Sequence, residues 1–211
     1  MCAIFIMKKY ILILSFSAIS FTLMAQVGYG IVASNDLYQW YKNPDDGISD
    51  PTHGNAILNL SVGPKIWVGG KKFSFSVEGQ ANMGFTGFTI GENKGYGAVA
   101  FPIIGSLNFG GLSTFDREGK AGFSLGGGIQ YNKTELYGLR DEFVDLGVTR
   151  DYFRTIIVQA VGGFGVSGFA LSGVLRFGFD PDTDAASFNF GIQYDFNRPM
   201  MKKIDDPNSA L

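Results

Sequence analysis

Apolar and polar residues alternate along much of this chain with a repeat of two. The stretch over 72–85, KFSFSVEGQANMGF, shows the pattern most clearly. Apolar residues or glycine occupy every second position from Phe73 to Met83, and Ser, Glu, Gln and Asn fill the positions between them. A repeat of two places neighbouring side chains on opposite faces of an extended strand. The stretch is therefore predicted to be a β-strand with one apolar face and one polar face.

Seven further segments show the same pattern, less regularly, and turn-rich stretches separate them. The predicted strands cover 27–34, 56–68, 73–85, 96–109, 121–131, 153–164, 168–179 and 187–196. Two of the odd-numbered connections, 37–55 and 132–152, are long and polar, and the connections 69–72 and 165–167 are tight. The connections 110–120 and 180–186 follow this rule less well. An even number of strands with turns alternating in length is typical of an outer-membrane barrel with both termini in the periplasm.

The number of large apolar side chains indicates which face of the predicted strands contacts water. Together the apolar faces carry far more bulky residues than the roughly dozen side chains that pack inside an eight-stranded barrel. The apolar side chains must then point outward into a nonpolar solvent, with the polar ones inside. A soluble exported sandwich could instead share them in a core, and a lipocalin-like barrel is the other soluble alternative. Aromatic residues near both ends of the predicted strands favour the transmembrane barrel.

The beginning of the chain is typical of a segment that directs export. Lys8 and Lys9 precede an apolar run over 10–24, and Ala25 supplies a small residue at the expected cleavage site. The run is short for a membrane span of roughly 20 residues. The sequence therefore predicts a signal peptide over 1–25, an all-β barrel over 26–196 and a short polar periplasmic tail over 197–211.

Composition excludes several classes of function. Cys2 is the only cysteine and lies in the predicted leader, so no disulfide or thiol chemistry is expected in the mature chain. The formal net charge of −2 indicates no basic surface for nucleic acid. Neither a glycine-rich phosphate loop nor a zinc-ligand spacing occurs, so we expect no cofactor and no metal.

The leader, the eight predicted strands and the aromatic last strand, FNFGIQYDF over 188–196, resemble the small outer-membrane barrels related to the OmpA transmembrane domain and OmpX. The junction of Ala25 and Gln26 also resembles exported proteins of Bacteroidetes-type bacteria. The resemblance implies an outer-membrane protein of a Gram-negative bacterium without catalysis, in a structural, surface-recognition or accessory-complex role. It also implies contact with outer-membrane lipid or lipopolysaccharide and with the barrel-assembly machinery. Family barrels often end at the last aromatic residue, whereas here residues 197–211 follow Phe196.

The polar faces of the predicted strands supply the candidate interior residues. Glu78 and Arg176 are costly to bury unless they are paired or hydrated. In a narrow barrel they are expected to join a hydrogen-bonded cluster with the other candidates, which are Gln80, Gln130, Asn189 and Gln193. Such a cluster would fill the lumen, and the alternative is a gate for a small ion pore. The narrowness of an eight-stranded barrel favours filling.

Two patterns suggest catalysis or ion binding, and neither is specific. Ser124 lies in GFSLG, which matches the G-x-S-x-G pattern of hydrolases, but that motif requires a strand-to-helix turn that is not predicted here. His53, the only histidine, follows Asp45, Asp46 and Asp50. With a serine and an acid it could serve a lipid-modifying barrel enzyme, and with the aspartates it could hold a divalent cation. A solvated loop of turn-forming residues explains the same composition.

The long loops are the remaining candidates for recognition. They are predicted to expose aromatic and charged side chains, and loops on a rigid scaffold often bind partners. The candidate residues for a protein partner outside the cell are Trp40, Tyr41, His53, Tyr137 and Arg140. An equally open interpretation is that the aromatic residues extend the outer aromatic belt. A short amphipathic helix is possible within 134–146.

Overall fold

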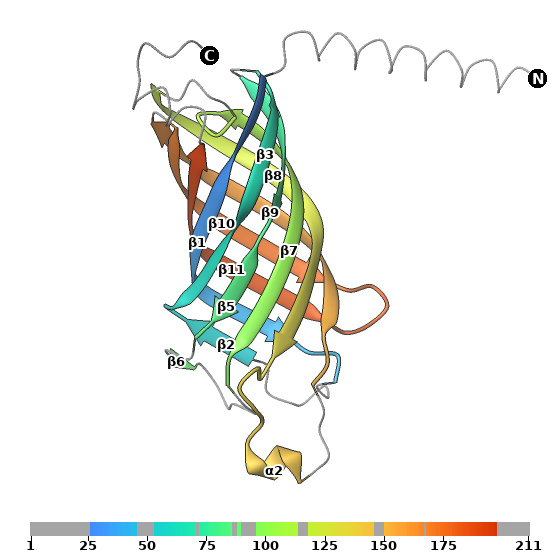
Figure 1. Cartoon of the computed structure of the whole chain (residues 1–211). Helices are drawn as coiled ribbons and strands as arrows, with labels where there is room; N and C mark the ends of the chain where they lie inside the picture. Colours follow the sequence, from blue (N-terminus) through green and yellow to red (C-terminus); the bar gives the residue numbers. More distant parts are fainter. Residues whose placement is uncertain are drawn as a thin grey trace, which may run out of the picture.

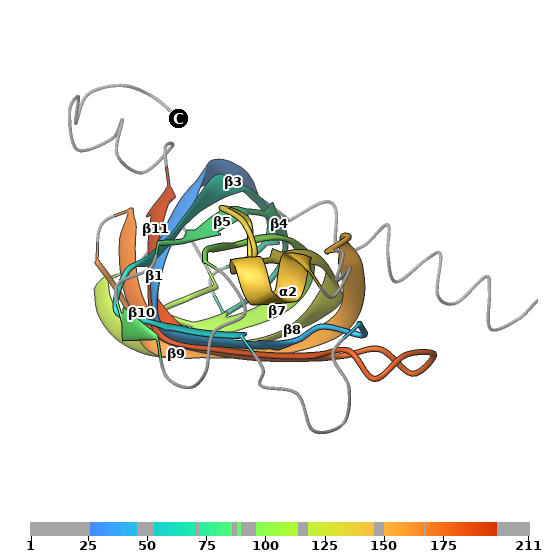
Figure 2. The ribbon, with the colours of Figure 1, turned by 90° about the horizontal axis from the view of Figure 1, so that it is seen from below.

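The structure is a computed structural model that describes residues 26–45, 53–70, 72–85, 88–89, 96–113, 118–145, 150–166 and 168–197. In this part of the chain, one antiparallel sheet closes on itself into a barrel, seen from the side in Figure 1 and along its axis in Figure 2. The elements are β1 (Gln26–Lys42), β2 (His53–Ala56), β3 (Asn59–Gly69), β4 (Phe73–Gly79), β5 (Ala81–Gly84), β6 (Phe88–Thr89), β7 (Ala98–Gly110), β8 (Glu118–Thr134), α2 (Asp141–Val144), β9 (Phe153–Val166), β10 (Phe169–Phe179) and β11 (Ala186–Asn197).

The barrel wall has eight positions around its circumference. β4 and β5 lie end to end between β3 and β7 and together form one wall position. From β7 onward each strand pairs with the next, and β1 closes the ring by pairing with both β11 and β3. Every pairing is antiparallel, which confirms the predicted all-β, eight-stranded, antiparallel up-and-down barrel.

Prolines on both neighbouring strands explain the gap between β4 and β5. The Gln80 N–H donates to the Pro102 carbonyl at 3.0 Å, but Pro102 has no N–H with which to complete the pair of ladder bonds. Pairing with β3 and β7 keeps the same register on both sides of Gln80. Pro64 on β3, opposite Gly79 in the same register, also lacks an N–H, so the interruption is a local loss of ladder hydrogen bonds and not a change of strand direction.

The two faces of the wall have the polarity of a transmembrane barrel. Phe75 points outward with 42% of its surface exposed, whereas Glu78 on the same strand points inward with 1% exposed. The same alternation holds on β3, β7, β9, β10 and β11. The outward side chains are mainly Val, Ile, Leu, Phe and Tyr, and most buried polar residues point inward. A soluble sandwich or lipocalin-like barrel would bury its phenylalanines, so neither alternative describes this fold.

The barrel has two distinguishable ends. We call the end where β1 begins and β11 stops the terminal end; the turn after β3 and the turn after β9 are also at this end. We call the opposite end the loop end, where Figure 1 shows α2 beyond the wall and Figure 2 shows it across the opening. The predicted helix within 134–146 is limited to Asp141–Val144. None of the helices in the described residues is long and apolar enough to cross a membrane.

Several predicted strand boundaries were wrong, chiefly at the loop end. β1 continues to Lys42 instead of stopping at residue 34, and it pairs there with β11 and β2. A register shift between Asp36 and Tyr38 inserts one residue into β1 and reverses the alternation that follows. The predicted strand over 56–68 is divided into β2 and β3, because Ile57 has a φ of 78° and turns the chain.

The inverted polarity predicts a depth-dependent response to charge on the outer face. Val158, in the middle of β9, and Val166, at its terminal end, are 51% and 46% exposed. In a bilayer, Val158→Arg is expected to lower the free energy of unfolding by about 2–4 kcal/mol, and Val166→Arg by about 0–1 kcal/mol. Urea titration of protein folded into vesicles measures both values. Equal, negligible effects would show that the outer face of β9 contacts water.

Candidate functional site in the barrel interior and at the loop end

A buried lysine between two carboxylates forms the centre of the interior. Lys65 Nζ lies 3.1 Å from Glu78 Oε2 and 3.2 Å from Asp195 Oδ2, and all three side chains are at most 5% exposed. Lys65 and Glu78 are directly paired across β3 and β4, while Asp195 reaches the lysine from β11 across β1. Gly30 on β1 faces Lys65, and a β-carbon there would lie 1.8 Å from the Phe196 carbonyl oxygen. Only glycine fits at this crossing.

A second group of polar side chains connects Arg176 to Glu78, one of the two carboxylates that contact Lys65. Arg176 donates from Nε and Nη2 to Gln159 Oε1, at 3.0 and 2.7 Å, and from Nη1 to Gln130 Oε1 at 3.4 Å. Gln159 Nε2 and Gln80 Nε2 both donate to Glu78 Oε1, at 3.3 and 3.1 Å. Glu78 and Arg176 are thus linked through Gln159 without a direct ion pair.

A third group is centred on Asp36, nearer the loop end. Its Oδ2 accepts hydrogen bonds from three amide groups: Gln39 Nε2 at 2.9 Å, Asn82 Nδ2 at 3.1 Å and Asn189 Nδ2 at 2.9 Å. Asn189 Nδ2 also donates to the Tyr41 hydroxyl at 3.2 Å. These residues come from β1, β5 and β11, so the cluster joins wall positions on both sides of β1.

The six interior candidates from the sequence are all buried, but the structure divides them. Glu78, Gln80, Gln130 and Arg176 belong to the lysine and arginine groups, whereas Asn189 lies in the Asp36 group. Gln193 Nε2 donates to Asp195 Oδ1 at 3.3 Å.

Sequence reasoning did not select Lys65, Asp195 or Asp36 for the interior. Asp195 lies between outward-facing Tyr194 and Phe196, so the alternation along this strand did indicate that Asp195 points inward. Lys65 follows Gly63-Pro64, where the alternation is less distinct, and Asp36 lies at the register shift of β1.

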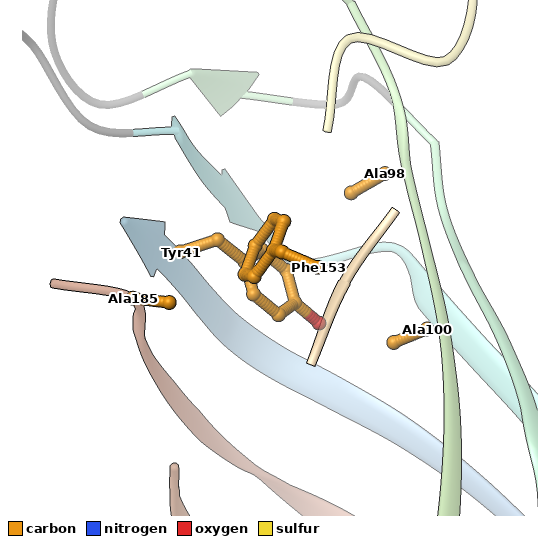
Figure 3. Packing of buried hydrophobic residues seen from close by; sticks show 5 residues of the cluster. All are labelled: Tyr41, Ala98, Ala100, Phe153 and Ala185. Carbon is orange, nitrogen blue, oxygen red and sulfur yellow. The ribbon is translucent and has the colours of Figure 1, made fainter. Parts of the chain in front are cut away.

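Two clusters of apolar side chains lie among the buried residues of the barrel. At the loop end, Figure 3 shows the rings of Tyr41 and Phe153 side by side, with the remaining cluster members Ala98, Ala100 and Ala185 around them. Toward the terminal end, a second buried cluster consists of Leu112, Val161, Ala170 and Val174. A hollow of about 640 Å³ lies instead on the outer face, where Ala33 and Ala81 leave space beside Phe101 and Tyr194.

The candidate hydrolase motif lacks the geometry that its chemistry requires. Ser124 lies inside β8, which continues for ten residues to Thr134, and its Oγ donates to Asn108 Oδ1 at 2.8 Å. The side chain is 4% exposed. A nucleophile elbow presents its serine at a sharp turn from a strand into a helix, so GFSLG does not form one here.

The loop candidates are placed in different environments. Tyr41 was predicted to be an exposed loop residue, which is wrong, because it lies in β1, points inward and is 1% exposed. Trp40 also lies in β1, half-buried and paired with Phe188. Tyr137 is 56% exposed and Arg140 is exposed. His53 begins β2, where its backbone pairs with Tyr41.

The proposed histidine and aspartate sites fall mostly outside the described residues. The structure describes the backbone of His53 but not its side chain, and Asp46 and Asp50 lie in the undescribed segment 46–52. Within the part of the chain that is described, no group of three or more His, Cys, Asp or Glu side chains is arranged to hold a metal ion.

The sequence matches no family model. No curated protein matches it either. Among solved structures, it is similar over 82% of its length to Neisserial surface protein A, with 11% identity, 97% of that chain covered and a TM-score of 0.46. It is also similar over 82% to the N-terminal β-barrel domain of OprF from Pseudomonas aeruginosa, with 8% identity, 100% coverage of that chain and a TM-score of 0.42.

A third similar structure is Ail, the attachment invasion locus protein of Yersinia pestis, with 11% identity and a TM-score of 0.43. The match covers 82% of this chain and 97% of that one. These are likenesses of fold alone, and the strand pairing described above defines the barrel independently of them.

The buried position of Lys65 predicts a large cost for its removal. Lys65→Met leaves Glu78 and Asp195 without their shared cation and is expected to lower the free energy of unfolding by about 3–5 kcal/mol. Lys42→Met, which breaks the exposed ion pair with Asp184, is the matched control and is expected to cost less than about 1 kcal/mol. Urea-induced unfolding in vesicles compares the two variants. Similar costs would mean that the Lys65 pairs do not stabilise the interior.

Proposed function

We propose that this chain is an integral outer-membrane β-barrel protein of a Gram-negative bacterium, with a filled interior and a structural or surface-recognition role. The inverted polarity of the wall carries the proposal. The outer face presents Phe, Val, Ile and Leu at positions where a water-soluble barrel would expose polar groups. Exposing such a surface to water is unfavourable, whereas a bilayer solvates it and leaves the backbone hydrogen bonds of the closed sheet intact.

The interior supports a filled barrel over an ion pore. Conduction requires a continuous path of water or of exchangeable ligands through the lumen. Here Lys65, Glu78 and Arg176 are held by one another and by intervening amides. Apolar clusters that include Phe153 and Val161 lie on either side of this polar region.

The asymmetry of the two ends supports an orientation with the termini in the periplasm. At the terminal end, the connections after β3 and β9 are short, as periplasmic turns are in bacterial barrels. The loop end carries the longer connections and α2, which would then face outside the cell. Phe196, near the end of β11, is the aromatic residue that the resemblance assigns to contact with the barrel-assembly machinery.

The described part of the connection between β8 and β9 is held in place by several contacts, which suits recognition of a protein partner. The buried ion pair between Arg150 Nε and Glu135 Oε2, at 2.9 Å, joins the two ends of the connection that contains α2. The Tyr137 N–H donates to the Tyr96 carbonyl at 2.8 Å, so this segment continues the pairing beyond β7 and β8. Tyr137 and Arg140 remain exposed on that support.

The outer rim of β8 and β9 supports contact with lipid headgroups, including lipopolysaccharide. Outward-facing Ile129 is followed along β8 by Tyr131 and then Lys133, whose Nζ lies 5.3 Å from the centroid of the Tyr152 ring. Arg154, 47% exposed, is paired with Tyr131 in the adjacent strand. A progression from aliphatic to aromatic to cationic side chains matches the change from hydrocarbon to anionic headgroups.

Membrane fractionation with a gel-shift assay tests the location and the fold together. The protein should be recovered with the outer membrane, resist extraction by carbonate, and migrate differently in gels before and after boiling, because a closed barrel stays compact until heated. Recovery of folded, monomeric protein from the periplasm without detergent would contradict the proposal.

Planar bilayer recording tests the filled interior separately. Purified barrel inserted into a planar membrane should produce no stable conductance steps in wild-type form, because the charged and amide side chains in the narrow lumen are held by one another. An OmpA-type barrel of known conductance, recorded under the same conditions, establishes that insertion would be detected. Discrete channel openings whose size changes in Arg176→Ala would show that the interior is a pore.

A further inference from the structure

The barrel interior carries one more negative charge than positive charge. Among the described residues, the buried charged side chains are Asp36, Lys65, Glu78, Glu135, Arg150, Arg176 and Asp195. Four of these are acidic and three are basic, which leaves a balance of −1 if all are ionised. Unbalanced charge in a poorly hydrated interior is costly unless a counter-charge lies nearby.

Among the four buried carboxylates of the described residues, Asp36 is the one without an ion pair. Glu135 and Arg150 form their own ion pair, and Lys65 contacts both Glu78 and Asp195. Arg176 lies between the two groups, because Gln159 links it to Glu78 and its cross-strand partner Asn189 donates to Asp36. The contacts of the Asp36 carboxylate are with Gln39, Asn82 and Asn189, and none of these side chains carries a charge.

The amides around Asp36 direct their oxygens away from it. Gln39 uses its Nε2 to donate to Asp36 and to Asn82 Oδ1, and Asn59 uses its Nδ2 to donate to the Asp36 backbone carbonyl at 2.8 Å. Gln39 Oε1 and Asn59 Oδ1 are both buried and have no hydrogen-bond donor among the described residues. Asn55, at 0% exposed, has no hydrogen bond at either polar atom of its side chain within the part of the chain that is described.

The unpaired atoms of these three amides lie close together beside Gly84. A β-carbon placed on Gly84 would lie 2.5 Å from Asn55 Nδ2, 2.9 Å from Asn59 Oδ1 and 3.1 Å from Gln39 Oε1. The groups come from β2, β3 and β1, and Gly84 ends β5. Because no hydrogen bond from the described residues holds the Asn55 amide, rotating it by 180° breaks none and directs a third oxygen toward the space beside Gly84.

We propose that this cluster binds a small monovalent cation of the sodium type, and we call it the amide site. Gln39 Oε1, Asn59 Oδ1 and the rotated Asn55 Oδ1 would be its ligands, in keeping with the preference of hard cations for oxygen. A single positive charge held by these oxygens brings the charge balance of the buried side chains to zero, whereas a divalent ion would reverse its sign. This inference rests on the interior geometry and holds whichever membrane contains the barrel.

Unfolding of the detergent-solubilised full chain in sodium chloride and in choline chloride, at equal ionic strength, tests the amide site. Choline is too large for the cluster, so it serves as the inert cation. An ion that binds only the folded state raises the folding constant by the factor 1 + [L]/Kd, so a tenfold increase in sodium above its Kd should raise that constant about tenfold. The urea midpoint reports this change.

Asn55→Ala is the informative variant, because Asn55 makes no hydrogen bond that its loss could break. It should abolish the dependence on sodium and leave the midpoint in choline unchanged or higher. Ser106→Ala, which removes another buried and unpaired polar atom, but from β7, is the matched control and should retain the full sodium response. Asn55→Asp adds a negative charge and should shift the preference from sodium to calcium.

The same data include the results that would overturn the proposal. If sodium and choline give the same midpoint for the wild-type chain, the cluster holds water only, which can donate to two amide oxygens and accept from Asn55 Nδ2. If Asn55→Ala retains the sodium response, sodium acts elsewhere. Either result leaves the outer-membrane location untouched, because fractionation and gel migration test that separately.

Discussion

Closure of the antiparallel sheet is the constraint on which the rest of the structure depends. When β1 pairs with both β3 and β11, no long strand is left with an open edge, and the wall satisfies its backbone groups internally. This is a requirement for a sheet that crosses hydrocarbon, where water cannot supply missing hydrogen bonds. Only after closure can the outer face be uniformly apolar, and then the polar half of every strand must point into a narrow interior.

The interior follows from this inversion. A lumen enclosed by eight strands is too narrow for a wide aqueous channel, so polar side chains must satisfy one another. Lys65, Glu78 and Asp195 do so through charge, and Arg176 does so through shared glutamine amides. The rings of Tyr41 and Phe153 pack together beside these polar groups at the loop end. The side chains that fill the barrel also hold its wall together, which leaves the loop end and the outer rim as the surfaces available to partners.

The sequence predicted the fold well, because a repeat of two is a local property that needs no knowledge of tertiary contacts. The total volume of the apolar side chains is too large for the barrel interior. The alternation along the strand then places Phe75 outside and Glu78 inside. The predicted strand boundaries at the loop end were wrong where the alternation of inward and outward side chains changes phase. The extra residue between Asp36 and Tyr38 reverses the faces of β1, and this is why Tyr41 was assigned to an exposed loop.

The interior contacts could be predicted only as a set of residues and not as partners. Which amide meets Asp36, or whether Lys65 reaches Asp195 across β1, depends on the relative register of neighbouring strands and on the room left by Gly30. No single strand encodes that register. The convergence of amides over Gly84 depends on it in the same way, since its groups come from β1, β2 and β3.

Spin-label accessibility along β9 tests the inverted barrel most directly. Labels placed one at a time at Ile156, Val158, Ala160 and Gly162, in a chain whose Cys2 has been removed or replaced, report collisions with oxygen dissolved in the bilayer and with a water-soluble nickel complex. The account predicts high oxygen and low nickel accessibility at all four outward positions, with the oxygen signal strongest nearest the bilayer centre. High nickel accessibility at these positions would show that the apolar face is in water and would contradict it.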